Sequence, residues 1–212
     1  MVDQECGRSP ICLTVPGLGC SGLGHWQTIW EAERDDCRRI DLGCWDAPLR
    51  SAWVSRIEQA VTAARAPVVL VAHSLGCHAV AWWARWAGED ASDVVRGALL
   101  VAPPDIDRPG IDRRLAGFAP APSAPLPFPS ILVASSNDPY ATIERSAGMA
   151  AGWRSSFVDA GKLGHINANS GLGAWREGQA LLARLIGSTV IEGPWRSPVA
   201  GATLANHGTR QA

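Results

Sequence analysis

The sequence has almost no lysine and no excess of basic charge, and the lack of basic excess limits which partners are to be expected. Lys162 is the single lysine, and 19 basic residues against 20 acidic ones leave a net charge of −1. A protein that binds nucleic acid or an anionic membrane surface through charge needs a basic patch to do so. We therefore expect neither nucleic acid nor a membrane among its partners.

Other features that are common in exported, membrane and metal-binding proteins are also missing. No apolar run reaches the roughly 18 residues that a membrane span needs. The first ten residues contain acidic side chains and no apolar stretch, unlike a signal peptide. The six cysteines form no C-x-x-C pair, which argues against a zinc ribbon or a thioredoxin-like redox site. These absences predict a cytoplasmic protein with reduced thiols and no metal or organic cofactor.

What is present is enough apolar sequence for one sizeable domain. The chain has 212 residues, of which 47% are hydrophobic and 18% charged, a composition typical of a globular core. Residues 188–212 lose periodicity and are rich in Gly, Pro and Ala. We therefore predict one domain over residues 1–187 and a disordered tail over 188–212.

Strand and helix patterns alternate along the predicted domain. The run PVVLVA at 67–72 is typical of a strand buried on both faces, whereas Trp26, Ile29 and Trp30 share one face of a helix. Ser51 could cap a second helix. Strands are expected at 11–17, 37–42, 67–72, 94–104, 130–138 and 155–161, and helices at 25–33, 51–64, 75–88, 139–152 and 173–187. This alternation predicts a three-layer α/β fold, with helices on both faces of a mostly parallel sheet.

A serine follows the central predicted strand, where parallel sheets carry their sites. Ser74 lies in the pentapeptide Ala72-His73-Ser74-Leu75-Gly76, between a strand and a helix. This is the context of the G-x-S-x-G nucleophile elbow, with alanine in place of the first glycine. Small residues on both sides of the serine allow the first turn of the helix to pack against the strand. The alternative interpretation is that Ser74 only caps the helix.

An acid and a histidine follow later strands in the order that α/β-hydrolases use. Asp138 comes just after the strand ILVASS, where an acid could orient a catalytic histidine. His165 follows the last predicted strand in a glycine-rich loop and is the candidate base. Taken alone, Asp138 could be a turn-forming aspartate and His165 an ordinary loop histidine.

The remaining site residues are expected close to Ser74. An oxyanion hole needs two backbone N–H donors, and Leu75 and Leu18 are the candidates. Leu18 lies in the glycine-rich loop VPGLGCSG, which lacks the G-K-[ST] of a phosphate-binding loop. A substrate pocket is expected around Gly17, His73 and Phe128. The Pro-rich segment 105–130 would form the rim of that pocket, as a minimal lid, with Phe118, Leu126 and Phe128 lining an acyl site or pinning the loop to the core.

Several long stretches, taken together, resemble one known family. VPGLG…HW, VLVAHSLG, GALLVAPPD, PLPFPSILVASSNDPY and FVDAGKLGHINANSGLGAW are similar to the small α/β-hydrolases of the retinoblastoma-binding-protein-nine and YdeN type. The likeness runs from about residue 11 to residue 187. It implies a serine hydrolase with Ser74 as nucleophile, Asp138 as triad acid and His165 as base, an active site close to the surface, and no cofactor.

The function expected from these observations is hydrolysis of a small-molecule ester or related acyl bond through an acyl-enzyme. Two alternatives stay open at the level of sequence. One is a non-catalytic protein-binding module built on a hydrolase scaffold, which would have a protein partner. The other is an acyltransferase, in which an alcohol or amine replaces water. The sequence does not define the physiological substrate or the oligomeric state.

Overall fold

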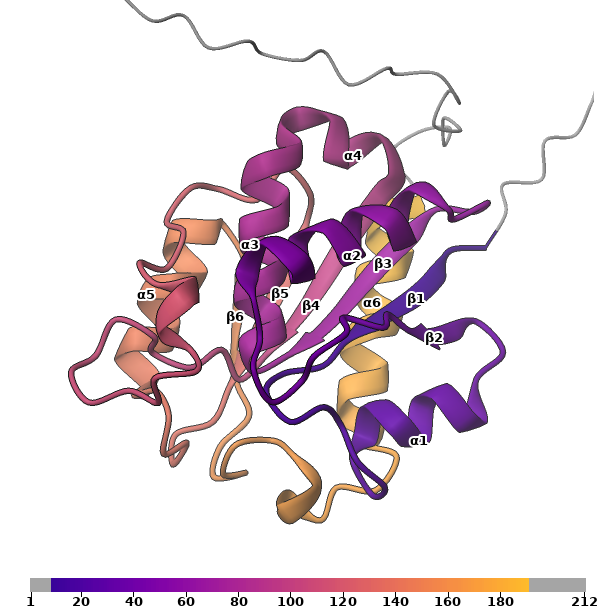
Figure 1. The fold of residues 1–212 in the computed structure, drawn as a ribbon. Helices are drawn as coiled ribbons and strands as arrows, with labels where there is room; N and C mark the ends of the chain where they lie inside the picture. Colours follow the sequence, from indigo (N-terminus) through magenta and orange to yellow (C-terminus); the bar gives the residue numbers. More distant parts are fainter. Residues whose placement is uncertain (1–8, 191–212) are drawn as a thin grey trace, which may run out of the picture.

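A computed structural model describes residues 9–190, which form a sheet of six strands between two layers of helices (Figure 1). The strands are β1 (Ile11–Val15), β2 (Cys37–Arg39), β3 (Val68–His73), β4 (Val95–Val101), β5 (Ser130–Ala134) and β6 (Ser156–Asp159). The α-helices are α1 (Trp26–Glu33), α2 (Arg50–Thr62), α3 (Leu75–Ala87), α4 (Ala91–Val94), α5 (Ile143–Trp153) and α6 (Arg176–Val190). Short 3₁₀ helices are η1 (Gly88–Asp90), η2 (Ala116–Phe118) and η3 (Ala168–Ser170).

Every strand pair in the sheet is parallel, and the strand order is β2-β1-β3-β4-β5-β6. β3 and β4 therefore occupy the centre, with all six residues of β3 buried. This explains the unbroken apolar run that the sequence shows there, because helices cover a parallel sheet on both faces. The three-layer α/β fold expected from the alternating pattern is confirmed.

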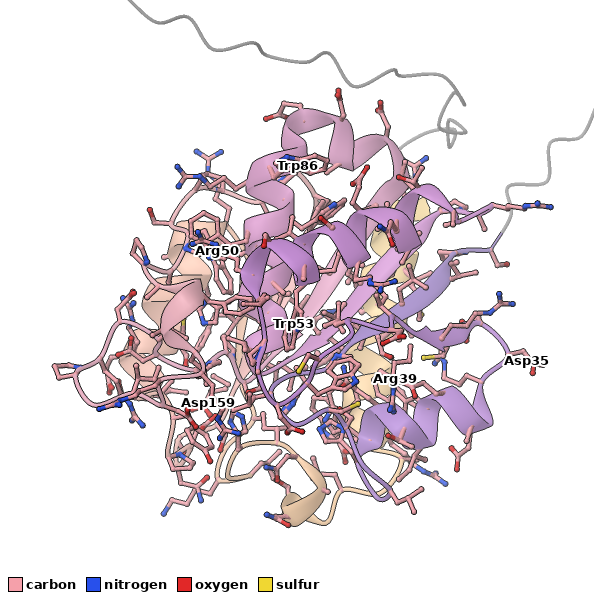
Figure 2. All side chains as sticks on the ribbon, in the orientation of Figure 1. Asp35, Arg39, Arg50, Trp53, Trp86 and Asp159 are labelled. Carbon is pink, nitrogen blue, oxygen red and sulfur yellow. The ribbon has the colours of Figure 1, made fainter. Side chains whose placement is uncertain are left out.

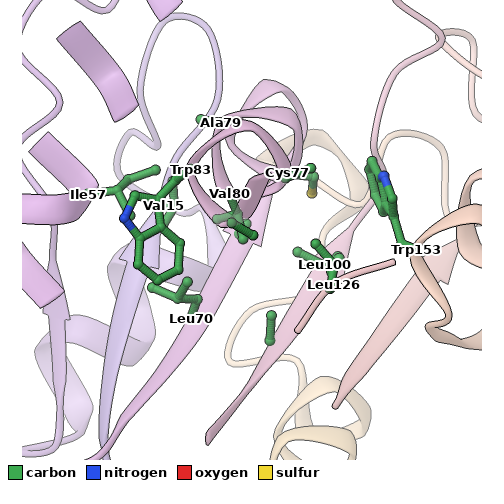
Figure 3. Close-up of a cluster of buried hydrophobic side chains, with 14 of the residues drawn as sticks. Val15, Ile57, Leu70, Cys77, Ala79, Val80, Trp83, Leu100, Leu126 and Trp153 are labelled. Atoms are coloured by element: carbon green, nitrogen blue, oxygen red, sulfur yellow. The ribbon is translucent and has the colours of Figure 1, made fainter. Parts of the chain in front are cut away.

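Two separate apolar cores lie on the two faces of the sheet. Successive residues of β3 point to opposite faces of the sheet. Leu70 belongs to the core with α2, α3 and α5, whereas Val71 belongs to the core with α1 and α6. Figure 3 shows the first core, with Val80 on the sheet-facing side of α3 between Trp83 and Cys77. α3 packs between α2 and the sheet, and these contacts fix its N-terminus at the end of β3.

The predicted boundaries need several corrections. Ser51 does not cap α2; the helix begins one residue earlier, and Leu49 is its N-cap without a side-chain hydrogen bond. The Pro-rich segment 105–130 contains the short helix η2, which Pro120 and Pro122 closely follow. Residues 188–190 continue α6 and do not begin the predicted tail. The rest of that tail, 191–212, lies outside the described residues.

Charged side chains lie mainly at the periphery, as Figure 2 shows for Asp35 in the turn between α1 and β2. Arg39 extends from β2 toward α1, where it forms an ion pair with Glu31 at 2.7 Å. Among the described residues, no helix is both long enough and apolar enough to cross a membrane. All five cysteines of this part of the chain are free thiols.

Candidate active site

Ser74 occupies a strained turn between β3 and α3. Its φ of 55° and ψ of −127° lie in a region that residues other than glycine rarely adopt. Its N–H donates to the Val101 carbonyl at 2.9 Å, which ties the turn to the end of β4. The side chain makes no capping hydrogen bond to α3. The hydroxyl is therefore available for chemistry, and the interpretation of Ser74 as a simple helix cap is wrong.

Two glycines allow this turn to sit against β1. A Cβ on Gly76 would lie 2.2 Å from the Val15 carbonyl oxygen, too close for any side chain. A Cβ on Gly17 would lie 2.7 Å from the Ser74 Cβ and 3.2 Å from the Leu75 nitrogen. The loop after β1 thus touches the serine turn directly, as expected for a loop that could help bind substrate.

The structure brings Ser74, His165 and Asp138 together in one hydrogen-bonded line. Ser74 Oγ lies 2.9 Å from His165 Nε2, and His165 Nδ1 lies 2.9 Å from Asp138 Oδ2. A carboxylate can only accept, so Nδ1 carries a hydrogen and Nε2 is free to accept the serine proton. The side chains of His165 and Asp138 are 10% and 3% exposed, which shields their contact from water.

Asp138 combines the two roles that the sequence left open. Its Oδ1 accepts the Tyr140 N–H at 2.9 Å, a turn of the kind that aspartate commonly forms before proline. The same carboxylate faces His165 Nδ1. The local turn therefore fixes the direction in which the carboxylate points toward the imidazole.

Side chains from neighbouring segments hold the His165 loop in place. Asn137 Oδ1 accepts the Gly164 N–H at 2.7 Å, and Ser135 Oγ accepts the Leu163 N–H at 2.9 Å. On the other side of His165, the Trp26 indole N–H donates to the Ile166 carbonyl at 2.8 Å. Sequence reasoning missed these supports, although Asn137 adjoins the predicted acid and Trp26 belongs to the HW pair.

The imidazole of His165 lies between two further rings. Tyr140 packs edge-on against it at 4.5 Å between ring centroids, and His73 lies at 4.9 Å. His73 Nε2 also lies 2.9 Å from the His165 carbonyl oxygen, to which it must donate. Burial lowers the pKa of His73 well below its usual value, with help from the neighbouring His165 and His25. His73 is thus a neutral donor that supports the backbone of His165.

His25 is a second buried histidine beside the site. It caps α1 through Nδ1, which accepts the Gln27 N–H at 3.1 Å, so its hydrogen resides on Nε2. Burial lowers the pKa of His25 to about 4, reinforced by the charges of Arg39 and His165. Its ring packs edge-on against His73 at 4.7 Å. Both imidazoles therefore stay uncharged near neutral pH.

A cavity of about 340 Å³ opens directly onto Ser74 and His165. Its walls come from the loops after β1, β4, β5 and β6, and the lining residues are Leu18, Cys20, Gly22, His25, His73, Ser74, Pro104, Arg108, Ile111, Asp112, Arg114, Leu115, Tyr140, His165, Asn167, Ala168 and Asn169. Of the residues expected around the pocket, His73 lines it, whereas Gly17 does not, because its backbone packs against the Ser74 turn.

Phe128 is not part of this cavity wall. Its ring is buried and stacks on Trp83 with centroids 6.2 Å apart, on the face of the sheet that α3 covers. Phe118 and Leu126 belong to the same core. The correction has a physical reason: the Pro-rich segment folds back onto the helices, and burying its large apolar side chains there removes them from water. These residues therefore attach the loop to the core, which is the second of the two roles that the sequence left open.

Leu75 and Leu18, whose amides are predicted to bind an oxyanion, lie next to Ser74 in the chain and on the wall of the cavity that Ser74 lines, respectively. Leu75 is the first residue of α3, and the first N–H groups of a helix have no intrahelical acceptor. In the opposite loop, the Gly19 and Cys20 amides already donate to the Trp45 and Gly17 carbonyls. Leu18, which precedes these two residues, lines the same cavity as Ser74. The predicted pair of donors thus stays a prediction that this arrangement permits.

The arrangement can perform acid–base and nucleophilic chemistry with side chains alone. Among residues 9–190, no group of three or more His, Cys, Asp or Glu is arranged to hold a metal ion. A hydroxyl, an imidazole and a carboxylate in hydrogen-bond contact form the arrangement that activates a serine toward acyl groups.

Known proteins resemble this chain in sequence and in fold. A family model described as "Serine hydrolase" matches residues 12–184. A solved structure described as a YdeN-like hydrolase from Pectobacterium atrosepticum is 32% identical, with a TM-score of 0.75 over 85% of this chain and 92% of that one. The comparison with curated proteins finds no match.

More distant structures share the fold. The ydeN gene product of B. subtilis is 16% identical, with a TM-score of 0.67 over 84% of this chain and 99% of that one. Est1E of Butyrivibrio proteoclasticus, solved with ferulic acid bound, is 12% identical, with a TM-score of 0.63 over 88% and 93% of the two chains. At these identities the likeness concerns the arrangement of strands and helices.

Proposed function

Because this chain belongs to the serine hydrolase family and is a hydrolytic enzyme, we propose that it cleaves a carboxylic ester with Ser74, His165 and Asp138 as catalytic residues. The observation that carries the proposal is the continuous contact from Ser74 Oγ through His165 to Asp138, with 2.9 Å at each step, facing a cavity. The substrate is a small-molecule ester, in keeping with the modest size of that cavity.

In the first half of the reaction, His165 Nε2 takes the proton of Ser74 as Oγ attacks the ester carbonyl carbon. Asp138 keeps the Nδ1–H tautomer and stabilises the charged imidazole. The amides of Leu75 and Leu18 donate to the oxyanion of the tetrahedral intermediate. Such donors each contribute about 2.7–4 kcal/mol to transition-state stabilisation. The C–O bond then breaks as His165 protonates the departing alcohol.

In the second half, water replaces the alcohol and cleaves the acyl-enzyme. His165 removes a proton from water, the hydroxide attacks the acyl carbonyl, and Ser74 leaves with the proton returned by His165. The neutral His73 supports this cycle, because its Nε2–H holds the His165 carbonyl at 2.9 Å while the imidazole changes charge.

A fluorophosphonate probe tests the proposal, because it reacts only with an activated serine. We expect mass spectrometry to find one adduct per chain, located at Ser74, and esterase activity on short aryl esters. Ser74→Ala should lower kcat by about four orders of magnitude or more and prevent labelling, and His165→Ala should do nearly the same.

The matched control is Ser136→Ala, which replaces an exposed serine in the loop after β5 and should leave labelling and activity intact. Full esterase activity in Ser74→Ala, or labelling of Ser74 that does not need His165, would refute the proposed mechanism.

A further inference from the structure

The cavity contains one positive charge that no acidic side chain of the described residues neutralises. Apart from its histidines, the charged side chains that line it are those of Arg108, Asp112 and Arg114. Arg114 binds Asp112 through two nitrogens, with Nη2–Oδ2 at 2.6 Å and Nε–Oδ1 at 3.0 Å, so this pair cancels its own charge. Within residues 9–190, Arg108 forms no ion pair.

The acids nearest to Arg108 in sequence are already occupied. Asp105 and Asp107 both bind Arg145 of α5, the first of them at 3.0 Å. Asp107 also accepts the Ala121 N–H at 3.0 Å. These contacts hold the start of the Pro-rich segment against α5 and against a later part of the same segment. The two carboxylates nearest to Arg108 along the chain are therefore paired with Arg145 and not with Arg108.

The guanidinium itself is anchored beside the catalytic acid. Arg108 Nη1 donates to the Pro139 carbonyl at 3.0 Å, one residue after Asp138. One edge of the guanidinium is thus fixed to the loop that carries Asp138. A guanidinium has five N–H donors in a planar fork, which leaves others for a carboxylate in two-point contact.

The rest of the wall suits the uncharged part of an acyl or alcohol group. Leu18, Ile111 and Leu115 bring apolar side chains to the same cavity as Ser74 and Arg108. A substrate with an apolar middle and an anionic end would match both features. A neutral ester would offer the cation no opposite charge.

We propose that the substrate is an ester that also carries a carboxylate, and that Arg108 binds this carboxylate while Ser74 attacks the ester carbonyl. The inference rests on the proposed ester hydrolysis and specifies its substrate class. The carboxylate can belong to the acyl group, as in a half-ester of a dicarboxylic acid, or to the departing alcohol.

Two matched pairs of aryl esters test the inference and distinguish these sources. The acyl pair is the para-nitrophenyl half-ester of glutaric acid against para-nitrophenyl butyrate. The alcohol pair is the acetate ester of para-hydroxybenzoic acid against that of para-hydroxybenzamide. We expect kcat/KM to favour the charged member of at least one pair by about fivefold, the upper end of the range for an exposed ion pair.

Arg108→Gln should abolish that preference, because it should raise KM for the charged ester by more than it raises KM for the neutral partner. The matched control is Arg113→Gln, which removes the same charge from an exposed residue of the same loop that does not line the cavity. The preference should persist in this control and decline at high salt.

Equal use of charged and neutral esters by the unmodified enzyme, or a preference that survives Arg108→Gln, would overturn this inference and leave ester hydrolysis standing. Hydrolysis of none of the four esters would instead refute the proposed function, and the assignment of Arg108 with it.

Discussion

At the scale of single residues, His73 links the two halves of the proposed catalytic machinery. It precedes the nucleophile at the end of β3, yet its Nε2–H donates to the carbonyl of His165, 92 residues later in the chain, at 2.9 Å. Its ring also packs against both His25 and His165. A change at His73 should therefore alter the position of the base without touching the nucleophile.

We predict that His73→Phe lowers kcat for a neutral aryl ester by about fivefold, as expected for the loss of one hydrogen bond of about 1 kcal/mol. His73→Gln, whose amide can donate to the same carbonyl, should recover part of the loss. Steady-state kinetics of both variants, with thermal unfolding as a check on folding, provide the measurement. Equal activity of His73→Phe and the unmodified enzyme would contradict this role.

Individual site residues differed in how far the sequence could predict them. Ser74, Asp138 and His165 could be identified because each follows a strand, and parallel strands bring their carboxyl ends to one edge. Tyr140 and the supporting contacts of Trp26 could not, because they depend on how separate loops meet. Phe128 was misplaced for the same reason, since its position depends on how residues 105–130 fold back.

At the scale of elements, α5 contains a glycine that no close packing requires. A Cβ at Gly148 would meet no atom within 4 Å, and the residue is exposed in the middle of the helix. Gly152, one turn further on, differs: its Cβ would lie 3.3 Å from the Ser123 carbonyl oxygen. Alanine substitutions at the two positions therefore distinguish the effect of helix propensity on stability from the effect of close packing.

We predict that Gly148→Ala increases the free energy of unfolding by about 0.5–1 kcal/mol, because glycine costs about that much relative to alanine inside a helix. Gly152→Ala should increase the free energy of unfolding by a smaller amount or decrease it, because the Ser123 backbone would have to shift. Urea unfolding of both variants measures the difference. A larger gain at 152 than at 148 would show that the close approach to Ser123 is not limiting.

Element types were easier to predict from the sequence than element ends. The β-branched run at β3 and the apolar face of α1 identify a strand and a helix without tertiary information. Five of the six strands are shorter than expected; β4, for example, ends at Val101, although apolar residues extend to Pro104. Pairing with neighbouring strands decides where a strand ends, and the local sequence does not contain that information.

At the scale of the whole molecule, buried neutral histidines should make folding sensitive to acid. Burial lowers the pKa of His25 and of His78 to about 4, and that of His73 also falls. In the unfolded chain these groups regain an ordinary pKa near 6.5. Between pH 6.5 and about 4 the unfolded chain therefore binds more protons, and the free energy of unfolding falls as the pH falls.

We predict that His78→Gln flattens this dependence. His78 lies in α3, away from the cavity wall, and its Nε2 donates to the Pro104 carbonyl at 2.7 Å. Glutamine can replace this donor but does not titrate. Urea unfolding at pH 7 and pH 5 should show a smaller loss of stability than in the unmodified protein, by up to about 1.4 kcal/mol per pH unit. An unchanged loss would mean that His78 does not contribute to acid sensitivity.

The spacing of the three proposed catalytic residues along the chain has a consequence for how the protein is made. Ser74 precedes His165 by 91 residues, and Asp138 lies between them. A ribosome adds about 5–20 residues per second, so for several seconds the growing chain contains the serine without its base. During that interval the hydroxyl is an ordinary alcohol, unreactive toward cellular esters. Synthesis itself thus delays catalysis until most of the domain exists to receive a substrate.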